Sequence, residues 1–210
     1  MERILIVDDH EVVRDGVKNI FDEQPSTTII GEARTAQEAL RLVWEQEWDL
    51  VVLDLSLGSR SGLEVLKEIK QSRSTLPVLI LSMHSEEQYA RRAFRAGASG
   101  YITKDSSRAE LAKAIDKVIK GGRYVSSEFA EKLTIDIEKG TQRLPHETLS
   151  DREFEVMCLI ASGKTVTEIA ELLSLSDRTI STYRARILEK TGMKTSAELT
   201  HYALQNKLVE

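Results

Sequence analysis

The chain has 210 residues, of which 41% are hydrophobic and 30% are charged, and its formal net charge is −5. This composition is typical of globular proteins and excludes a wholly disordered or collagen-like chain. The longest apolar stretches, near residues 50–55 and 78–83, fall far short of the ~20 residues that a membrane helix needs. The N-terminal residues carry no secretory leader pattern, and Cys158 has no second cysteine with which to form an internal disulfide. We therefore expect a cytoplasmic protein without membrane association, with between one and two domains of about 150 residues each.

Short apolar runs alternate with helical patterns through the first 120 residues. The runs are rich in leucine and β-branched residues and predict strands at residues 3–7, 28–32, 50–53, 78–81 and 100–102. After each run, apolar residues recur every three or four positions, which predicts helices with one buried face at residues 10–22, 36–46, 62–70, 86–96 and 108–120. These units predict an α/β domain with a doubly wound five-stranded parallel sheet, covered by helices on both faces and connected by right-handed crossovers.

A different pattern begins after residue 122. Residues 126–137 are weakly helical in pattern, and residues 138–148 combine turn residues with no apolar period, which predicts a linker. Beyond the linker the pattern predicts four short helices, at residues 150–162, 165–174, 176–191 and 196–206. A tight turn at 173–176 separates the middle two, which is the layout of a helix-turn-helix. We therefore divide the chain into an α/β domain (1–122), a helix and linker (123–147) and a second, small all-α helix-turn-helix domain (148–210).

Polar residues at several predicted helix starts are spaced as capping boxes. In such a box the first hydroxyl accepts a hydrogen bond from the backbone N–H three residues later, and the acid or amide at that position accepts one in return. The expected boxes pair Thr35 with Glu38, Ser85 with Gln88, Ser107 with Glu110, Ser150 with Glu153, and Thr165 with Glu168.

Five reactive side chains follow or end predicted strands. They are Asp8, Asp9, Asp54, Ser82 and Lys104. Because the carboxyl ends of parallel strands meet at one edge of a sheet, we expect these groups to converge there. Three clustered carboxylates repel one another unless a hard cation such as Mg²⁺ is bound, and a carboxylate supported by a metal and a lysine can attack a phosphoryl group. A single aspartate at a strand end is more often a turn or cap residue, but five such groups at one edge are poorly explained in that way.

Four segments of the first domain resemble the receiver domains of bacterial response regulators. They are Ile4-Leu5-Ile6-Val7-Asp8-Asp9-His10, Val51-Val52-Leu53-Asp54-Leu55, Ile80-Leu81-Ser82 and Gly100-Tyr101-Ile102-Thr103-Lys104. The second domain, from Leu149-Ser150-Asp151-Arg152-Glu153 through Gly192, resembles a LuxR-type helix-turn-helix. The combination is similar to the NarL/FixJ family over nearly the whole chain. The resemblance implies a flavodoxin-like receiver domain that controls a DNA-binding domain.

The resemblance also implies roles for the acidic residues of the first domain. Asp54 would accept a phosphoryl group from a sensor histidine kinase and carry it as an aspartyl phosphate. A Mg²⁺ cofactor would be bound directly by Asp9, Asp54 and the backbone carbonyl of Ser56, with Asp8 acting mainly through water.

Further roles follow by resemblance for three residues at the other strand ends. Ser82 and Lys104 would bond the phosphoryl oxygens. Tyr101 would be the switch aromatic, turning inward as Ser82 is drawn to the phosphate, which is an electrostatic event that biases a packing element with two states. We expect His84, two residues beyond Ser82, to be a solvent-facing loop residue.

The third helix of the second domain carries a basic stripe. Five basic residues and one acidic residue lie between Arg178 and Lys194, and such a stripe can bind DNA phosphates even in an acidic protein. With Ile180 facing the core, small and basic side chains point outward, as insertion into a major groove requires. The candidate DNA contacts, including positions that the resemblance adds, are Thr165, Arg178, Thr179, Ser181, Thr182, Tyr183, Ala185, Arg186 and Lys190. Whether the arginines contact phosphate or a guanine edge stays open, and a solvated helix face is the alternative.

We therefore predict a DNA-binding transcriptional regulator that is controlled by phosphorylation of Asp54, forms homodimers on phosphorylation or DNA binding, and is not itself an enzyme. One alternative is a phosphotransferase or phosphatase similar to dehalogenase-like hydrolases. Those enzymes use a second Asp two residues after the nucleophile, where this chain has Ser56. A second alternative is a DNA-binding protein that works without phosphorylation and whose first domain is a protein-interaction module. The presence of Asp9, Asp54, Ser82 and Lys104 argues against it.

Overall fold

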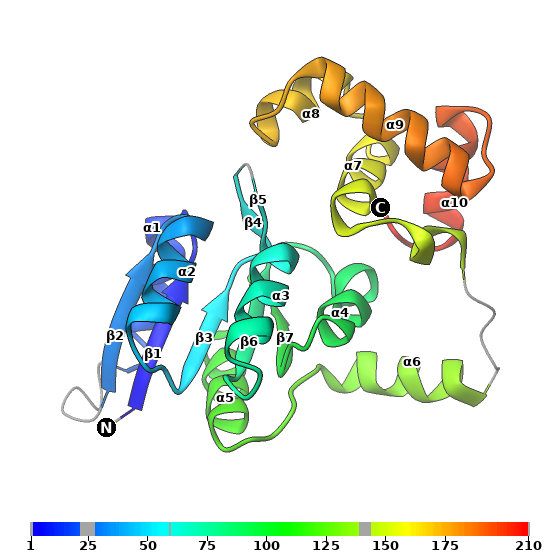
Figure 1. Ribbon diagram of the computed structural model, residues 1–210. Coiled ribbons are helices and arrows are strands. Elements are labelled where there is room, and N and C mark those ends of the chain that lie inside the picture. The colour runs from blue at the N-terminus through cyan, green and yellow to red at the C-terminus, as the bar shows by residue number, and fades with distance from the viewer. Residues whose placement is uncertain (1, 22–27, 59, 139–143, 210) are drawn as a thin grey trace. The chain divides into compact units, whose positions relative to one another are not determined.

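The computed structural model describes residues 2–21, 28–58, 60–138 and 144–209, without the side chains of 133–138 (Figure 1). Contacts within the chain divide it into two units, Met1–Ala130 and Glu131–Glu210. Each unit is described by itself. Among the described residues, no helix is both long enough and apolar enough to cross a membrane.

Five parallel strands form the sheet of the first unit, which confirms the predicted α/β fold. In order across the sheet they are β2 (Thr28–Ala33), β1 (Glu2–Val7), β3 (Leu50–Leu53), β6 (Val78–Ser82) and β7 (Gly100–Thr103). β3 and β6 are buried along their whole length because both faces of the sheet are covered. Val7 pairs with Ala33 on one side and Leu53 on the other, and Ser82 pairs with Thr103. The carboxyl ends of the strands therefore lie at one edge, where β6 and β7 run two residues beyond β3, since Leu53 pairs with Ile80.

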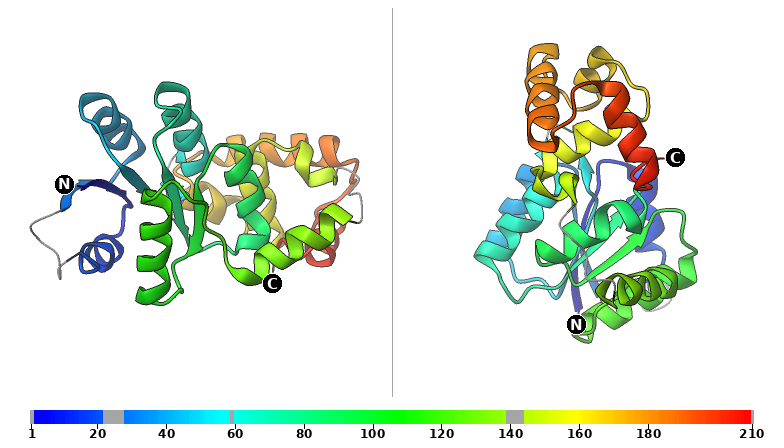
Figure 2. Two further views of the ribbon diagram at one scale, coloured as in Figure 1. Left: turned by 90° about the horizontal axis from the view of Figure 1, so that it is seen from below. Right: turned by 90° about the vertical axis from the view of Figure 1, so that its right-hand side faces the viewer.

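Helices pack on both faces of this sheet (Figure 2). They are α1 (Glu11–Lys18), α2 (Ala36–Glu45), α3 (Gly62–Ser72), α4 (Glu86–Arg95) and α5 (Arg108–Ile119). α1 and α5 cover one face, where Val17 and Ile115 join a core with strand residues such as Ile6, and α2, α3 and α4 cover the other. α1 is shorter than predicted because the Ile20 N–H donates to the carbonyl three residues back, which tightens the turn. The last residue of the predicted helix, 22, lies outside the described residues.

Three of the predicted capping boxes are confirmed, at Ser107, Ser150 and Thr165. Thr35 accepts a hydrogen bond from the Glu38 N–H, but the Glu38 carboxylate accepts from the backbone N–H of Arg34 instead of closing the box. The box predicted at Ser85 is wrong, since that side chain caps nothing. There the Gln88 N–H donates to the backbone carbonyl of Ser85, which satisfies the donor that the hydroxyl would have met.

The first unit ends in a segment that extends the sheet and then becomes a helix. Tyr124 bridges Gly100 in parallel, and its carbonyl accepts from the Tyr101 N–H at 3.0 Å. α6 (Ser127–Glu138) follows, which confirms the weak helical pattern. Glu86, the first residue of α4, holds the start of α6. One of its carboxylate oxygens accepts from the Ser126 backbone N–H at 3.0 Å, and the other accepts from the Ser126 hydroxyl.

Short helices build the second unit, as the sequence predicts. After the 3₁₀ helix η1 (Pro145–Thr148) come α7 (Asp151–Ala161), α8 (Val166–Leu172), α9 (Asp177–Thr191) and α10 (Ser196–Gln205). η1 falls within the predicted linker, whose residues 139–143 lie outside the described part of the chain. α9 packs against α7 and α8 and buries Ile180 and Ile187 completely. Ser176 caps α9 by accepting from the Thr179 N–H.

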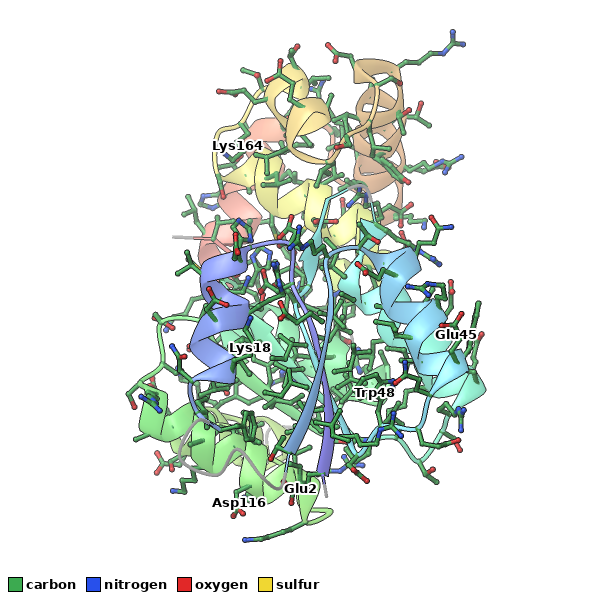
Figure 3. All side chains as sticks on the ribbon, turned by 90° about the vertical axis from the view of Figure 1, so that its left-hand side faces the viewer. Glu2, Lys18, Glu45, Trp48, Asp116 and Lys164 are labelled. Atoms are coloured by element: carbon green, nitrogen blue, oxygen red, sulfur yellow. The ribbon has the colours of Figure 1, made fainter. Side chains whose placement is uncertain are left out.

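A close contact on the edge strand β2 leads to a first prediction. Trp48 (labelled in Figure 3) donates its indole N–H to the Leu42 carbonyl at 3.0 Å. Its ring lies across Gly31, where a Cβ atom would stand 2.2 Å from the ring. We expect Gly31→Ala to lower the free energy of unfolding by about 1–3 kcal/mol, the usual cost of overpacking. Urea denaturation followed by tryptophan fluorescence measures it, since both tryptophans of the chain, Trp44 and Trp48, lie in the first unit.

Gly16→Ala is the matched control. A Cβ at Gly16 meets no atom within 4 Å, and alanine in a helix interior is favoured over glycine by roughly 0.5–1 kcal/mol. We expect this variant to be more stable than the parent chain. Equal losses of stability in both variants would contradict the packing of Trp48 on β2.

Candidate functional site

Polar side chains from four strands meet at the carboxyl edge of the sheet. Asp8 follows β1, Asp54 follows β3, Ser82 ends β6 and Lys104 follows β7. The backbone pairing of the sheet continues to the site residues. The Asp54 N–H donates to the Val7 carbonyl at 2.9 Å, and the Lys104 N–H donates to the Ser82 carbonyl at 2.8 Å. Asp8, Asp54 and Ser82 are 2%, 1% and 0% exposed. The predicted convergence is therefore present in the structure.

The ammonium group of Lys104 lies between two buried carboxylates. Its Nζ is 2.7 Å from Asp8 Oδ2 and 2.7 Å from Asp54 Oδ2. Burial alone would lower the pKa of Lys104, but Asp54 and Asp8 raise it above its usual value, so the lysine is charged. Burial raises the pKa of Asp54 to about 6, against the opposing effect of Lys104. Asp54 Oδ1 is buried and has no hydrogen-bond partner among the described residues.

Four potential metal ligands lie together beside this ion pair. Ligand atoms of Asp8, Asp9, His10 and Asp54 lie within 4.8 Å of one another. Carboxylate oxygens are the donors that Mg²⁺ prefers, and three of these four residues are aspartates. The residues present therefore fit a hard divalent cation. Ser56, the source of the predicted carbonyl ligand, lies two residues beyond Asp54.

The sequence prediction missed one member of this cluster, His10. Its Nδ1 lies 2.7 Å from Asp9 Oδ1 and 3.2 Å from Asp8 Oδ1. The signal that points to it is its place directly after the two aspartates. The ring is largely exposed, so it caps the cluster on the solvent side.

A group of hydrogen bonds links Ser82 to the aromatic residue Tyr101. The Ser82 hydroxyl oxygen accepts from the His84 N–H at 3.2 Å, and the Tyr101 hydroxyl donates to the His84 carbonyl at 2.9 Å. Tyr101 is fully buried, and that burial raises the pKa of its hydroxyl. His84 lies in a loop, as predicted, but it is half-buried and does not simply face solvent, because its ring stacks on Tyr89 with centroids 4.3 Å apart. Burial, helped by the nearby charge of Lys104, lowers the pKa of His84.

The candidate DNA contacts lie on α9 and at the start of α8. Seven of the nine are exposed and Thr179 and Tyr183 are half-buried, whereas Ile180 and Ile187 on the inner face of α9 are fully buried. The Thr182 hydroxyl donates to the Arg178 carbonyl at 2.9 Å. Arg178 and Arg186 make no ion pair with the described residues 144–209. The two guanidinium groups are therefore available to an anionic ligand.

Lys190 differs from the other candidates because it has an internal partner. Its Nζ lies 2.7 Å from Glu153 Oε2, which is buried at the start of α7. The same Glu153 oxygen accepts from the Ser150 N–H at 2.7 Å. Lys190 therefore joins the end of α9 to the capping box of α7, whatever it does toward DNA.

Both halves of the chain match known families. Residues 4–116 match the response regulator receiver domain, and residues 147–203 match the luxR family of bacterial regulatory proteins. The chain belongs to the LuxR-type response regulators. Its relatives include the response regulator UvrY of Escherichia coli K12, 34% identical over 99% of this chain and 96% of the relative. The transcriptional regulatory protein LiaR of Bacillus subtilis is 36% identical over the full length of both chains.

A solved structure shares the architecture of this response regulator. It is RcsB from Salmonella enterica serovar Typhimurium, bound to the promoter P1flhDC in the presence of the phosphomimetic BeF₃⁻. It is 26% identical, covers 98% of each chain and has a TM-score of 0.60. The protein is thus a two-component response regulator homologous to transcriptional regulators, and the family that the motifs predict is confirmed.

In this response regulator the loop after Asp54 folds back on the backbone of Asp54. A small antiparallel hairpin of β4 (Ser56–Leu57) and β5 (Arg60–Ser61), which the sequence did not predict, precedes α3. The Gly62 N–H then donates to the Leu55 carbonyl at 2.8 Å. A Cβ at Gly62 would stand 2.1 Å from the Asp54 carbonyl oxygen. Only glycine permits this approach, which fixes the backbone that carries the Asp54 carboxylate.

The Lys190–Glu153 pair leads to a prediction for the response regulator's stability. Burial alone would raise the pKa of Glu153, but hydrogen bonds from Lys190 and Ser150 hold it below its usual value. The stability that the pair contributes is therefore present above the pKa of the unfolded glutamate and is lost as pH falls through the lower folded value. We expect Lys190→Met to cost about 1 kcal/mol at pH 7, because one partner is partly exposed, and nothing once Glu153 is protonated.

Amide hydrogen exchange of α7 and α9 peptides, compared at pH 7 and under acid conditions, measures this local stability. Lys194→Met is the control, since Lys194 is exposed and forms no ion pair among the described residues. A loss at pH 7 of the same size for both lysines would refute the structural role of the pair.

Proposed function

We propose that Asp54 is the phosphoryl acceptor and that a sensor histidine kinase is the donor. The observation that carries the proposal is the state of the Asp54 carboxylate. It is buried, Oδ2 is bound to Lys104 at 2.7 Å, and Oδ1 accepts no hydrogen bond from the described residues. An anchored carboxylate with one free oxygen is arranged as a nucleophile.

In the proposed reaction Asp54 Oδ1 attacks the phosphorus of a phosphohistidine. The new O–P bond forms as the N–P bond to the histidine breaks, and the imidazole leaves with the electron pair. Lys104 bonds a phosphoryl oxygen and stabilises the charge that develops there. Asp9, Asp54 and the Ser56 carbonyl would hold Mg²⁺, with Asp8 acting through water. When bound, the ion neutralises phosphoryl oxygens and orders them.

We infer that the Ser82 hydroxyl then bonds the phosphoryl group. That hydroxyl now accepts from the His84 N–H, and the His84 carbonyl accepts from Tyr101. A movement of Ser82 therefore changes the partners of the loop that holds Tyr101. This arrangement supports Tyr101 as the switch aromatic.

We infer that α9 enters the major groove of promoter DNA and that the protein acts in the cytoplasm as a homodimer. The exposed basic face of α9 and the capped N-terminal end of that helix support the docking. The related RcsB was solved on promoter DNA with a phosphomimetic. A dimer is the usual way in which such domains bind two half-sites.

Substitution of the acceptor tests the first proposal. Asp54→Asn keeps the shape but removes the nucleophilic charge, so we expect no base-labile phosphate adduct after incubation with acetyl phosphate and Mg²⁺. Phosphate-affinity electrophoresis or intact-protein mass spectrometry measures the adduct. The control is Asp105→Asn, an exposed neighbour of Lys104, which should label as the parent chain does. Wild-type labelling of Asp54→Asn would overturn the assignment.

A second experiment separates positioning on DNA from reading of its sequence. If Arg186 contacts a phosphate, Arg186→Ala weakens binding to every duplex, and the slope of log affinity against log salt falls by about one unit. With its hydroxyl bonded to its own helix, Thr182 presents a methyl group. Thr182→Ala should therefore cost on the order of 1 kcal/mol on the cognate site and little on scrambled DNA.

Binding is measured for both variants on cognate and scrambled duplexes at several salt concentrations. Arg184→Ala is the control, because its guanidinium donates to Ser196 at 2.8 Å within the domain. We expect it to leave the slope nearly unchanged. An unchanged slope for Arg186→Ala, or equal losses on both duplexes for Thr182→Ala, would show that α9 docks differently.

A further inference from the structure

A buried arginine lies behind the acidic cluster and takes no part in the proposed phosphoryl transfer. Arg14, on α1, is 1% exposed. Its Nη1 donates to the backbone carbonyl of Asp8 at 2.9 Å, and its Nε donates to Glu32 Oε2 on β2 at 2.8 Å. The guanidinium group of Arg14 therefore bonds two places at once, the backbone of Asp8 just past β1 and the side chain of Glu32 on the edge strand β2.

We propose that Arg14 is a positioning residue for the divalent-metal site, because it fixes the Asp8–Asp9 peptide from which the Asp9 carboxylate projects. The inference rests on the proposed function in one respect, namely that Asp9 binds the metal directly.

The backbone of Asp8 shows why its carbonyl needs a partner. The Asp8 N–H donates to Ala33 on β2 at 3.1 Å, which is the last bond of that ladder. The Asp8 carboxylate is held by Lys104 and by the His10 N–H, at 2.7 and 2.8 Å. The carbonyl lies just past the paired strand, and Arg14 supplies its donor.

Asp9 has weaker restraints of its own, which makes its backbone decisive. Its side chain is 41% exposed and contacts the exposed ring of His10. The direction of its carboxylate is therefore set mainly by the peptide that precedes it. Groups that orient metal ligands change metal affinity without touching the ion.

Packing alone does not account for a charged group at this place. A buried charge is costly unless it is paired and hydrogen-bonded, and an apolar side chain of similar volume would fill the same space. Nor does Glu32 need Arg14 as a partner, since Lys18 lies 2.8 Å from Glu32 Oε1. Hydrogen bonds from Lys18 and Arg14 together lower the pKa of Glu32. The remaining distinctive contact of Arg14 is the one to Asp8.

Lys18 offers a matched control (labelled in Figure 3). It lies on the same helix, carries the same charge and bonds the same glutamate, but its other partner is Asp15 at 2.7 Å. Removing either cation makes the surroundings of the acidic cluster more negative, which by charge alone would leave Mg²⁺ binding unchanged or tighter. Loss of positioning has the opposite sign, so the direction of the change separates the two causes.

The test is titration of the full chain with MgCl₂ by calorimetry, with folding checked by circular dichroism. We expect Arg14→Met to weaken Mg²⁺ binding about tenfold, the lower end for groups that orient metal ligands. We expect Lys18→Met to bind Mg²⁺ within twofold of the parent chain. Unchanged or tighter binding by folded Arg14→Met would overturn the proposal, as would equal weakening in the two variants.

Two further variants make the test conclusive. If Arg14→Met does not fold, Arg14→Lys takes its place in the titration. Lysine keeps the positive charge but lacks the forked group that reaches Asp8 and Glu32 together. We expect it to weaken Mg²⁺ binding at least threefold, and parental affinity would overturn the proposal. Asp9→Ala tests the underlying metal site. If Asp9→Ala leaves Mg²⁺ affinity unchanged, the proposed metal site is wrong; if only the Arg14 variants are unchanged, the positioning role alone is wrong.

Discussion

The arrangement of the receiver unit depends on the ion pair that Lys104 makes with two buried carboxylates. Lys104 follows β7 at one side of the sheet, and its ammonium passes the end of β6 to reach Asp54 and Asp8, after β3 and β1. That reach is possible because the parallel strands all end at the same edge of the sheet. Without the lysine, two buried carboxylates would lie close together with no positive charge between them, which disfavours the charged form of each. The register of the sheet therefore determines the charge balance of the site, because it brings Lys104 within reach of both carboxylates.

Hydrogen bonds connect this site to the end of the unit along a short path. Ser82 is bonded to the backbone of His84, and the carbonyl of His84 accepts from Tyr101. The loop that carries His84 leads directly into α4, whose first residue, Glu86, holds Ser126 at the start of α6. The stacking of His84 on Tyr89 adds a packing contact to the same loop. Ser82 at the edge of the site and Ser126 at the start of α6 thus belong to one continuous set of contacts.

Much of this arrangement follows from the sequence because it depends on period and order alone. Buried parallel strands read as apolar runs, and their polar end residues must share an edge, so Asp8, Asp54 and Lys104 can be brought together without coordinates. Local competition is harder to predict. Ser85 has the spacing of a capping box, yet backbone carbonyls satisfy the donors first. The surroundings of His84 depend on which way a loop turns onto α4, and no periodicity encodes that.

Contacts between elements that are distant along the chain are equally hard to predict from the sequence. Arg14 reads as one polar position on an amphipathic helix, and its burial becomes visible only when α1 lies against the Asp8 carbonyl and β2. Lys190 reads as part of a basic stripe, although its ammonium reaches back to Glu153. Both are long cations that the sequence pattern assigns to the surface. Their partners are fixed by tertiary packing, which a one-dimensional pattern does not contain.

α9 has a buried face that holds the domain together and an exposed face that carries basic residues. Its buried face, with Ile180 and Ile187, holds the bundle together, and its last turn carries the Lys190 that pairs with Glu153.

Among the other basic residues of α9, Arg184 donates a hydrogen bond to Ser196 at the start of α10. Of the basic residues between 178 and 190, these contacts leave Arg178 and Arg186 without a side-chain hydrogen bond or ion pair among the described residues. The two are eight positions apart, so at 100° per residue they lie about 80° apart around the axis and about 12 Å apart along it. The exposed Thr182 lies midway between them in the sequence, and its hydroxyl is already bonded to the Arg178 carbonyl. A charged group toward each end and a small residue between them let a helix approach DNA closely while its charges stay separated enough to reach different phosphates.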